Sequence, residues 1–276
     1  MKKVYPAASS HAGEDRTAAP PDAPPPPGGL AWPPLVSGTL VKRYKRFLAD
    51  VRLDNGTIVT AHCPNSGSMQ ACADPGRPVY LSQHDNPRRK LAYTWEIIDM
   101  PTSLVGVNTQ VPNRLVARAI ADGVVPELTG YDTITREVRT GDRSRLDLLL
   151  TAAGRRPCYV EVKNCTLVNQ GQACFPDAVT TRGRRHLEEL QQLIADGSRG
   201  VIFFLIQRMD ANIFQPADHI DPEYGRALRQ AGKKGVEILV YDVSLTREQI
   251  ALNRRVRHQL QMTGTAAYSS PLFSSG

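Results

Sequence analysis

The stretch CYVEVKN, residues 158–164, combines the features of a buried strand with two charged side chains. β-Branched residues such as Val160 and Val162 are typical of a packed sheet. Because side chains alternate between the two faces of a strand, Glu161 and Lys163 share the face opposite the valines. The charged pair indicates either an ordinary ion pair on a solvent-facing edge or part of a metal-dependent active site.

The composition of the chain favours a basic protein that binds a polyanion. It has 276 residues, of which 41% are hydrophobic, and a formal net charge of +7. This length is sufficient for one large domain or two small ones, and the charge favours nucleic acid as a partner. The longest apolar run, VIFFLI at 201–206, is too short to cross a bilayer, and no apolar run follows the N-terminal lysines. We therefore expect a cytoplasmic protein without membrane contact, and homo-oligomerisation stays open.

The cysteines favour a reducing compartment. Their number is odd and their spacing matches no common zinc-binding pattern. An alternative is a partial metal site of His62, Cys63 and Cys72, although structural zinc normally has four ligands. Reduced thiols are the favoured interpretation. The five cysteines are Cys63, Cys72, Cys158, Cys165 and Cys174.

The first part of the chain predicts a tail followed by a small barrel. Residues 1–33 are rich in Pro, Ala, Gly and Ser and are predicted to be disordered, and residues 263–276 are predicted to form a flexible tail. The DNG turn at 54–56 predicts a β-hairpin. Several short strands within residues 34–112 indicate a closed or half-closed barrel. The strand candidates are residues 40–53, 57–63, 75–85 and 92–100.

Residues 113–262 show a different pattern, in which strands alternate with amphipathic helices. Asn113 is suited to cap the first helix and Gly123 to end it. The predicted order is helix, three strands, helix, strand, helix, strand and a final helix, which is typical of a mixed α/β sandwich. The predicted strands are residues 131–138, 145–152, 158–164, 200–207 and 236–243, and the later helices are residues 178–196, 222–232 and 246–260.

Acidic residues on neighbouring strands favour the active-site interpretation of the charged pair. Asp147 lies on the strand before Glu161, and the short loop between these strands suits an antiparallel pair with neighbouring carboxylates. Such carboxylates repel each other unless a cation lies between them, and their oxygens suit Mg²⁺ or Mn²⁺. Lys163 would then stabilise charge on a phosphate, and Glu137 would add a further carboxylate. These residues are a minimal set for phosphodiester hydrolysis.

Basic residues near these acids are consistent with a phosphate-containing substrate. Arg145 shares the face of Asp147 on its strand. Arg182, Arg185 and His186 form one stripe of the long helix that follows the EVK strand. An ordinary solvated helix face would show the same stripe, so the helix alone does not distinguish the two interpretations.

Several longer blocks of the sequence resemble the sugar fermentation stimulation protein A (SfsA) family. They are RYKRFLADV, HCPNSGSM, SRLDLLL, EVKNCTL and FPDAVTTRGRRHLEEL, in order within residues 35–245. The resemblance implies the α/β (α+β) fold class, with an OB-like barrel followed by a PD-(D/E)xK, restriction-endonuclease-like mixed α/β sandwich. It also implies a nuclease that acts on DNA or RNA. An older description of the family is a DNA-binding regulator of sugar-utilisation genes.

The motif positions of the family carry over to this chain residue by residue. The resemblance implies that Asp147 and Glu161 bind the metal and that Lys163 is the motif lysine. Glu137 lies where such domains often have an additional acid. The Pro-rich N-terminal segment is not part of the family pattern.

The predicted barrel offers a surface for a nucleic-acid strand, because OB-type barrels bind strands through a basic groove and stacking rings. The predicted contacts in the barrel are Arg43, Tyr44, Lys45, Arg46, Asn65, Ser66, Arg88 and Arg89. Each has a plainer interpretation as a core residue, a turn residue or part of a solvated loop. In the second domain the predicted contacts are Arg145, Arg182, Arg185 and His186.

Three functions remain open from the sequence. The leading hypothesis is a Mg²⁺-dependent nuclease whose barrel binds the strand that the second domain cuts. The alternative is a non-catalytic DNA-binding regulator with a helix-turn-helix at residues 223–239, although VEILVYDV at 236–243 suits a strand better. A third option is a phosphohydrolase with a small nucleotide substrate, and the basic net charge argues against it.

Overall fold

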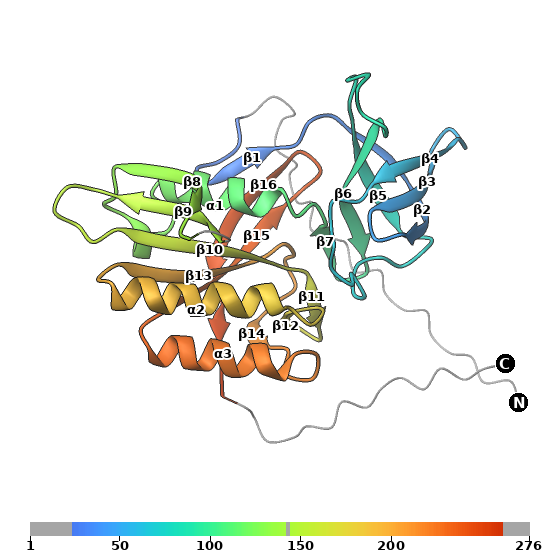
Figure 1. Cartoon of the computed structure of the whole chain (residues 1–276). Coiled ribbons are helices and arrows are strands. Elements are labelled where there is room, and N and C mark those ends of the chain that lie inside the picture. Colours follow the sequence, from blue (N-terminus) through green and yellow to red (C-terminus); the bar gives the residue numbers. More distant parts are fainter. Residues whose placement is uncertain (1–23, 142–143, 262–276) are drawn as a thin grey trace, which may run out of the picture.

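The computed structural model describes residues 24–141 and 144–261, which form a β-barrel and a larger mixed α/β domain (Figure 1). The strands of the barrel are β2 (Leu35–Tyr44), β3 (Leu48–Leu53), β4 (Ile58–His62), β5 (Pro78–Gln83), β6 (Tyr93–Met100) and β7 (Ser103–Gly106). They are hydrogen-bonded in the order β4-β3-β2-β5-β6-β7, and a parallel contact of β4 with β6 closes a five-stranded barrel. The OB-like barrel predicted from the sequence is thus confirmed.

Alternating apolar side chains form the core of the barrel. In β3, Ala49, Val51 and Leu53 are buried, while the residues between them are more exposed. They pack around Trp95 of β6, which is fully buried. The predicted DNG turn at residues 54–56 connects β3 to β4.

The strand predicted over residues 40–53 is interrupted by a turn. Lys45 and Arg46 have φ angles of 47° and 62°, a left-handed conformation in which the chain reverses between β2 and β3. Lys45 and Arg46 therefore lie at the tip of a hairpin and not within a continuous strand.

The second domain is built on a seven-stranded mixed sheet. Its strands are β1 (Gly29–Ala31), β8 (Thr133–Arg139), β9 (Arg145–Thr151), β10 (Cys158–Cys165), β13 (Arg199–Ile206), β15 (Glu237–Leu245) and β16 (Gln249–Arg255). Their order is β1-β16-β15-β13-β10-β9-β8; the central strands β10, β13 and β15 are parallel, and β9 is antiparallel to β10. A separate four-stranded sheet contains β11 (Leu167–Asn169), β12 (Gln172–Phe175), β14 (Ile213–Pro216) and β17 (Arg257–His258).

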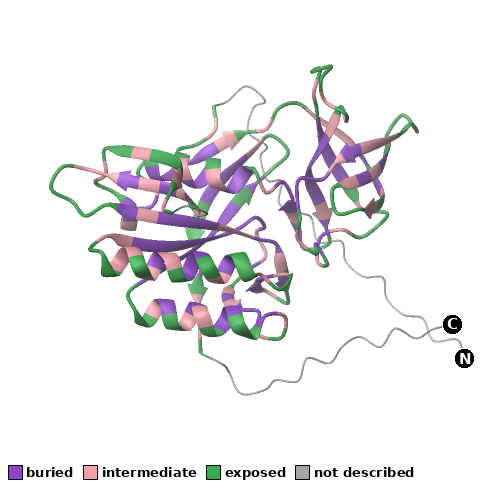
Figure 2. Ribbon diagram, viewed as in Figure 1, coloured by how far each residue is buried: buried purple, intermediate pink, exposed green. Residues whose placement is uncertain are grey.

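Helices cover both faces of the large sheet, which is why its central strands are apolar throughout. α2 (Thr181–Ala195) and α3 (Pro222–Lys233) pack on one face, while α1 (Val111–Ala121), followed by the short 3-10 helix η1 (Pro126–Leu128), lies on the other (Figure 1). Residues 200–206 of β13 are all buried between these layers (Figure 2). The predicted mixed α/β sandwich is therefore confirmed.

The final helix predicted over residues 246–260 is wrong. Residues 249–255 form β16, which pairs with β15 on one side and with β1 on the other. Ile250 and Leu252 are buried in the core on the α1 face, so pairing at the sheet edge outweighs the helical spacing of apolar residues. The helix-turn-helix considered for residues 223–239 is also wrong, because α3 leads directly into strand β15.

The segment predicted as an N-terminal tail contributes a strand to the sheet. Residues 1–23 lie outside the described residues, but Gly29–Ala31 pairs with β16 as β1. The tail predicted at 263–276 also lies outside the described residues. Among the helices that the structure describes, none has the length and apolar character needed to span a membrane.

Candidate active site

Glu161 and Lys163 lie on a central strand and not at an exposed edge. Strand β10 is hydrogen-bonded to β9 on one side and to β13 on the other. Glu161 exposes only 3% of its surface and faces α2, whereas Val160 and Val162 belong to the core on the α1 face. The interpretation of the pair as an ordinary solvent-facing ion pair is therefore wrong.

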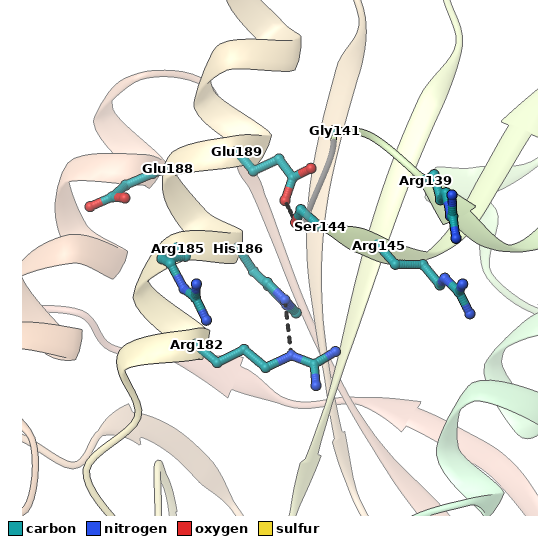
Figure 3. A pocket seen from close by; sticks show the side chains of 9 residues that line it. All are labelled: Arg139, Gly141, Ser144, Arg145, Arg182, Arg185, His186, Glu188 and Glu189. Carbon is teal, nitrogen blue, oxygen red and sulfur yellow. Dashed lines mark hydrogen bonds between the residues drawn. The ribbon is translucent and has the colours of Figure 1, made fainter.

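Glu161, Lys163 and His186 form one buried cluster. The Nζ atom of Lys163 lies 2.6 Å from Oε1 of Glu161, and Nδ1 of His186 bonds to the same oxygen. Arg182 donates from Nε to Nε2 of His186 over 3.3 Å (Figure 3). Because Nε2 accepts this bond, the ring proton lies on Nδ1, and His186 donates it to Glu161. A strand and a helix thus hold the same carboxylate oxygen.

Asp147 is held between β10 and α1. Its Oδ2 accepts a hydrogen bond from the backbone N of Val162 over 2.8 Å, and its Oδ1 accepts one from Nδ2 of Asn113 over 2.6 Å. The regular pairing of β9 with β10 ends just before this point. The Asp147 side chain therefore bonds to the strand that carries Glu161, next to Glu161 itself.

The two carboxylates influence each other electrostatically. Burial, followed by the negative charge of Glu161, raises the pKa of Asp147 to about 6. Burial also acts to raise the pKa of Glu161, but the hydrogen bond from His186 and the charge of Lys163 outweigh burial and lower it. Glu161 is thus stabilised as an anion, while the ionised form of Asp147 is disfavoured unless a further positive charge is present.

The donor atoms fit a hard divalent cation. Oε2 of Glu161 is buried and has no hydrogen-bond partner among the described residues. Such an orphaned oxygen is costly, and oxygen is the ligand atom that Mg²⁺ and Mn²⁺ prefer. In residues 24–141 and 144–261, no three His, Cys, Asp or Glu side chains are arranged around a metal position, so the alternative site at His62, Cys63 and Cys72 is wrong. All five cysteines are buried, and none of them forms a disulfide.

Glu137 lies close to Asp147 in the sheet but takes another partner. It falls between the two residue pairs of β8 and β9 that flank Asp147. Its φ angle is 57°, and its exposed side chain forms an ion pair with Arg145 at 3.4 Å. The expected third carboxylate at the Asp147–Glu161 pair is therefore not formed by Glu137 in this structure.

A basic cavity of about 720 Å³ adjoins the buried cluster. The arginines that line it are Arg139 from β8, Arg145 from β9, and Arg182 and Arg185 from α2 (Figure 3). His186 also lines the cavity and links it to Glu161. Glu189 accepts hydrogen bonds from the hydroxyls of Thr140 and Ser144, which ties α2 to the β8–β9 connection. Guanidinium groups around a cavity of this kind suit a phosphate.

Arg43 and Asn65, predicted to contact nucleic acid, instead build the loop at residues 64–69. The Arg43 guanidinium donates to the main-chain carbonyls of Arg46, Asn65, Gly67 and Ser68. Asn65 is buried, donates to the carbonyl of Val107 and accepts from the backbone N of Gly67. Neither side chain has much remaining capacity for a phosphate. His186 is likewise buried and bonds to Glu161, and it also lines the basic cavity.

The other predicted barrel contacts lie on separate surfaces. Arg46 and Ser66 line a groove of about 580 Å³ between the barrel and the loop before α2. Tyr44 donates its hydroxyl to Asp50. Lys45 and Arg88 are exposed, whereas Arg89 lines a different cavity, next to the N-terminus of α1.

The roles of two residues, Asn113 and Asp177, were not predicted from the sequence. Asn113, predicted to cap α1, holds Asp147, while the N-cap residue of the helix is Gln110. Asp177 joins the two domains, because its Oδ2 accepts from the Ser68 hydroxyl over 3.3 Å and from the backbone N of Met69 over 3.2 Å. Both contacts connect residues far apart in the chain, so no local pattern indicates them.

Comparisons with known proteins agree with this architecture. Residues 110–249 match the family described as the sugar fermentation stimulation protein RE domain, and residues 41–107 match the SfsA N-terminal OB domain. The chain is 58% identical over 223 residues to the sugar fermentation stimulation protein homolog of Geobacter sulfurreducens, and 56% identical over 224 residues to that of Pelobacter propionicus. Both alignments cover 81% of this chain, and they cover 95% and 97% of the respective relatives.

A solved structure has the same fold. The structure of Pyrococcus furiosus SfsA in complex with Ca²⁺ matches this one with a TM-score of 0.76 at 28% sequence identity. The match covers 83% of this chain and 98% of the Pyrococcus furiosus chain. From its sequence identity to these relatives and the match of both its domains, the chain belongs to the sugar fermentation stimulation protein (SfsA) family.

Proposed function

We propose that this protein is a metal-dependent nuclease that hydrolyses phosphodiester bonds of DNA, RNA or both. The observation that supports this most directly is the buried Glu161, which bonds to Lys163 through Oε1 and has no partner for Oε2 among the described residues, while Asp147 bonds to the backbone N of the adjacent Val162. Burying charged groups costs folding free energy, and a protein that only binds nucleic acid would not need to bury them. The neighbouring basic cavity supports a phosphate-containing substrate.

We expect Asp147 and Glu161 to hold Mg²⁺ or Mn²⁺. A divalent ion of this type polarises a phosphoryl oxygen and lowers the pKa of a bound water. The Pyrococcus furiosus relative was solved in complex with Ca²⁺, which also takes oxygen ligands. This supports, for the present chain, a site for a divalent cation.

The side chains around the two carboxylates would position and stabilise the reacting phosphate. Lys163 keeps Glu161 ionised, and its ammonium group would stabilise the negative charge that develops on the phosphate. His186 fixes the orientation of Glu161. Arg145 and Arg182 would bind neighbouring phosphates of the strand through paired N–H donors. The groove between the two domains would hold the rest of the strand.

Substitution of Lys163 tests the proposal. Labelled single- and double-stranded DNA and RNA would be incubated with the wild type, Lys163→Ala and Lys234→Ala in Mg²⁺, Mn²⁺ or EDTA. Lys234 is an exposed lysine after α3 and serves as the matched control. We expect metal-dependent cleavage by the wild type and Lys234→Ala, and loss of cleavage but not of binding in Lys163→Ala. If the wild type leaves every strand as intact as Lys163→Ala does, the protein is a binding protein and not a nuclease.

The salt dependence of binding tests the basic cavity separately from catalysis. Affinity for a labelled strand in EDTA should fall linearly with salt on logarithmic axes, because phosphate contacts release counterions. Arg182→Gln should reduce the slope by about one. Binding that does not respond to salt would contradict a surface that follows phosphates.

A further inference from the structure

A second polar cavity lies outside the candidate active site. It has a volume of about 240 Å³ and lies where the barrel, the segment after β1 and the first turn of α1 meet. Strands β4, β5 and β6 contribute His62, Ser82 and Glu96 to its lining. None of the carboxylates proposed to hold the metal lines it. The cavity is smaller than pockets for drug-sized ligands, which begin at about 300 Å³, so its size suits one small molecule or one residue of a polymer.

The floor of this cavity is a rigid network of buried polar side chains. Ser82 and Asn108 donate to the two oxygens of Glu96, each over 2.7 Å. Thr94 accepts from Arg89 over 2.9 Å and contacts the His84 ring at 3.2 Å. Ser82, Thr94, Glu96 and Asn108 are each less than 10% exposed. Burying apolar side chains costs less free energy than burying polar ones. A floor of hydrogen-bonded polar side chains is therefore consistent with a polar ligand above it.

The rim of the cavity is positively charged and carries an aromatic ring. Arg89 and Arg114 both line it, and within the described residues the Arg114 guanidinium has no hydrogen bond or ion pair, whereas Arg89 donates to Thr94. Burial and the charge of Arg89 lower the pKa of His62. Glu96 is therefore the one negative charge against two arginines among the lining residues. Trp32 forms part of the wall, and its indole N–H donates to the carbonyl of Thr246 over 3.1 Å, which fixes the ring.

Helix α1 connects this cavity to the candidate active site. Arg114 lines the cavity, while the preceding residue, Asn113, donates to Asp147. Consecutive residues of a helix rise by about 1.5 Å, so the two side chains start from adjacent points on the first turn. The cavity and the hydrogen bond to Asp147 therefore share the first turn of α1, although the two side chains leave the helix about 100° apart.

We propose that this cavity binds one terminal nucleotide of the substrate strand, with its phosphate at Arg89 and Arg114 and its base against Trp32. Arginines bind phosphate through paired donors, and aromatic side chains stack on bases of any sequence. The volume of about 240 Å³ is on the scale of one nucleotide and too small for a continuous strand. Nucleotide binding rests on the cavity alone, whereas its role as a strand-end pocket rests on the proposed nuclease function.

Binding of free nucleotides in EDTA tests the cavity without catalysis. The full chain would be titrated with AMP, GMP, CMP and UMP, followed by calorimetry and by tryptophan fluorescence. The other tryptophan, Trp95, is fully buried in the barrel, so a change in emission reports Trp32. We expect saturable binding that is at least ten-fold weaker in Arg114→Gln and in Trp32→Leu. Arg118→Gln is the matched control, since Arg118 lies one turn further along α1 and pairs with Asp122.

Three outcomes would overturn the proposal. They are no saturable binding, equal loss in Arg114→Gln and Arg118→Gln, and binding of inorganic phosphate or ribose 5-phosphate as tight as that of the nucleotides. Cleavage then separates this inference from the nuclease proposal. Nucleotide binding without any cleavage would support the nucleotide site and contradict the nuclease proposal. Cleavage without nucleotide binding would support the nuclease proposal and contradict the nucleotide site. With both present, Arg114→Gln should slow cleavage of a linear strand at least ten-fold more than cleavage of a closed circular one, and equal slowing would refute the strand-end role.

Discussion

Glu96 in the barrel and Glu161 in the second domain are both buried glutamates, but their hydrogen bonds differ. Glu96 is 5% exposed, and each of its oxygens accepts a bond from a neutral side chain, Ser82 on one side and Asn108 on the other. Its role is complete within the protein, because every carboxylate oxygen has a partner. Glu96 therefore stabilises the junction between β5, β6 and the segment before α1.

Glu161 is bonded on one side only. Lys163 and His186 both bond to its Oε1, while its buried Oε2 has no partner in the described part of the chain. Both residues have similar burial, so burial alone does not separate a structural carboxylate from a functional one. The two residues differ in how many of their oxygens have a partner, and this difference is the basis for proposing a functional role for Glu161.

The largest expected effect is on catalysis, in Glu161→Gln. Glutamine keeps the shape and one carbonyl oxygen but removes the negative charge that would hold a cation. We expect the cleavage rate to fall by about 1,000-fold, the upper scale for loss of one electrostatic group at an active site. Glu223→Gln, an exposed position on α3, is the control and should cleave at the wild-type rate. A cleavage rate of Glu161→Gln within ten-fold of the wild-type rate would contradict a catalytic role for Glu161.

The next effect concerns Asp147 and the pH dependence of stability in EDTA. Its folded pKa of about 6 lies above the ordinary value of 3.8, so between these values the folded protein binds more protons than the unfolded chain. The free energy of unfolding should therefore fall as pH rises from about 4 to about 6, by at most about 3 kcal/mol. Asp147→Asn should flatten this dependence, and Mg²⁺ should restore stability at pH 7. Urea denaturation at several pH values measures it, and identical pH profiles for both proteins would contradict the assignment.

Stability should respond to Glu161→Gln more than to Glu96→Gln, because Glu161 pairs with a charged lysine and Glu96 with neutral side chains. The glutamine amide at position 96 would face the amide of Asn108 or the hydroxyl of Ser82, which leaves a buried donor without an acceptor. We expect the free energy of unfolding to fall by about 2 kcal/mol. At position 161 the amide would also be a buried donor without an acceptor, and Lys163 would lose its charged partner, so the expected loss is about 3 kcal/mol. Urea midpoints in EDTA compare the two, and a reversed order would break the comparison.

The smallest effect tests a third carboxylate, Asp177, which is less buried than either glutamate. It accepts bonds from Ser68 and Met69 of the barrel, so it connects the two domains. Asp177→Asn should weaken these charge-assisted bonds and lower the unfolding free energy by about 1 kcal/mol. Protease susceptibility of the loop at residues 64–69, measured in parallel, should rise. An unchanged cleavage pattern at that loop would mean that Asp177 does not hold the domains together.

Much of the fold was predictable because its signals are local. The DNG turn at 54–56, the helices at 181–195 and 222–233 and the central strands all occur where turn chemistry or apolar spacing indicated them. The final helix was wrongly predicted because apolar spacing at 249–255 says nothing about the open edge of β15 that these residues fill. A strand at residues 29–31 was missed for the same reason, since its order depends on pairing with β16.

In the candidate site, too, features set by local sequence were predictable and features set by tertiary packing were not. Arg145, Arg182 and Arg185 were expected near phosphate and do line one cavity, because strand alternation and helical periodicity place them on known faces. Arg43 and Asn65 were expected at a binding surface, but Arg43 donates to carbonyls of the loop at residues 64–69 and Asn65 donates to the carbonyl of Val107, and neither contact is a local property of the sequence. Basic composition indicated a surface charge, and only the folded chain shows which arginines are already bonded.

The sequence by itself determined that Glu161 and Lys163 share a strand face opposite two valines, since the alternation of side chains is a property of the extended backbone. It did not determine that this face is buried, that His186 and Asn113 hold the two carboxylates, or that one oxygen of Glu161 is left unbonded. These contacts form only when α1 and α2 pack on opposite faces of the sheet. His186 and Glu161 are 25 positions apart in the chain, and Asn113 and Asp147 are 34 positions apart. Hydrogen bonds act over about 3 Å, so their partners are decided by tertiary packing and not by position in the chain.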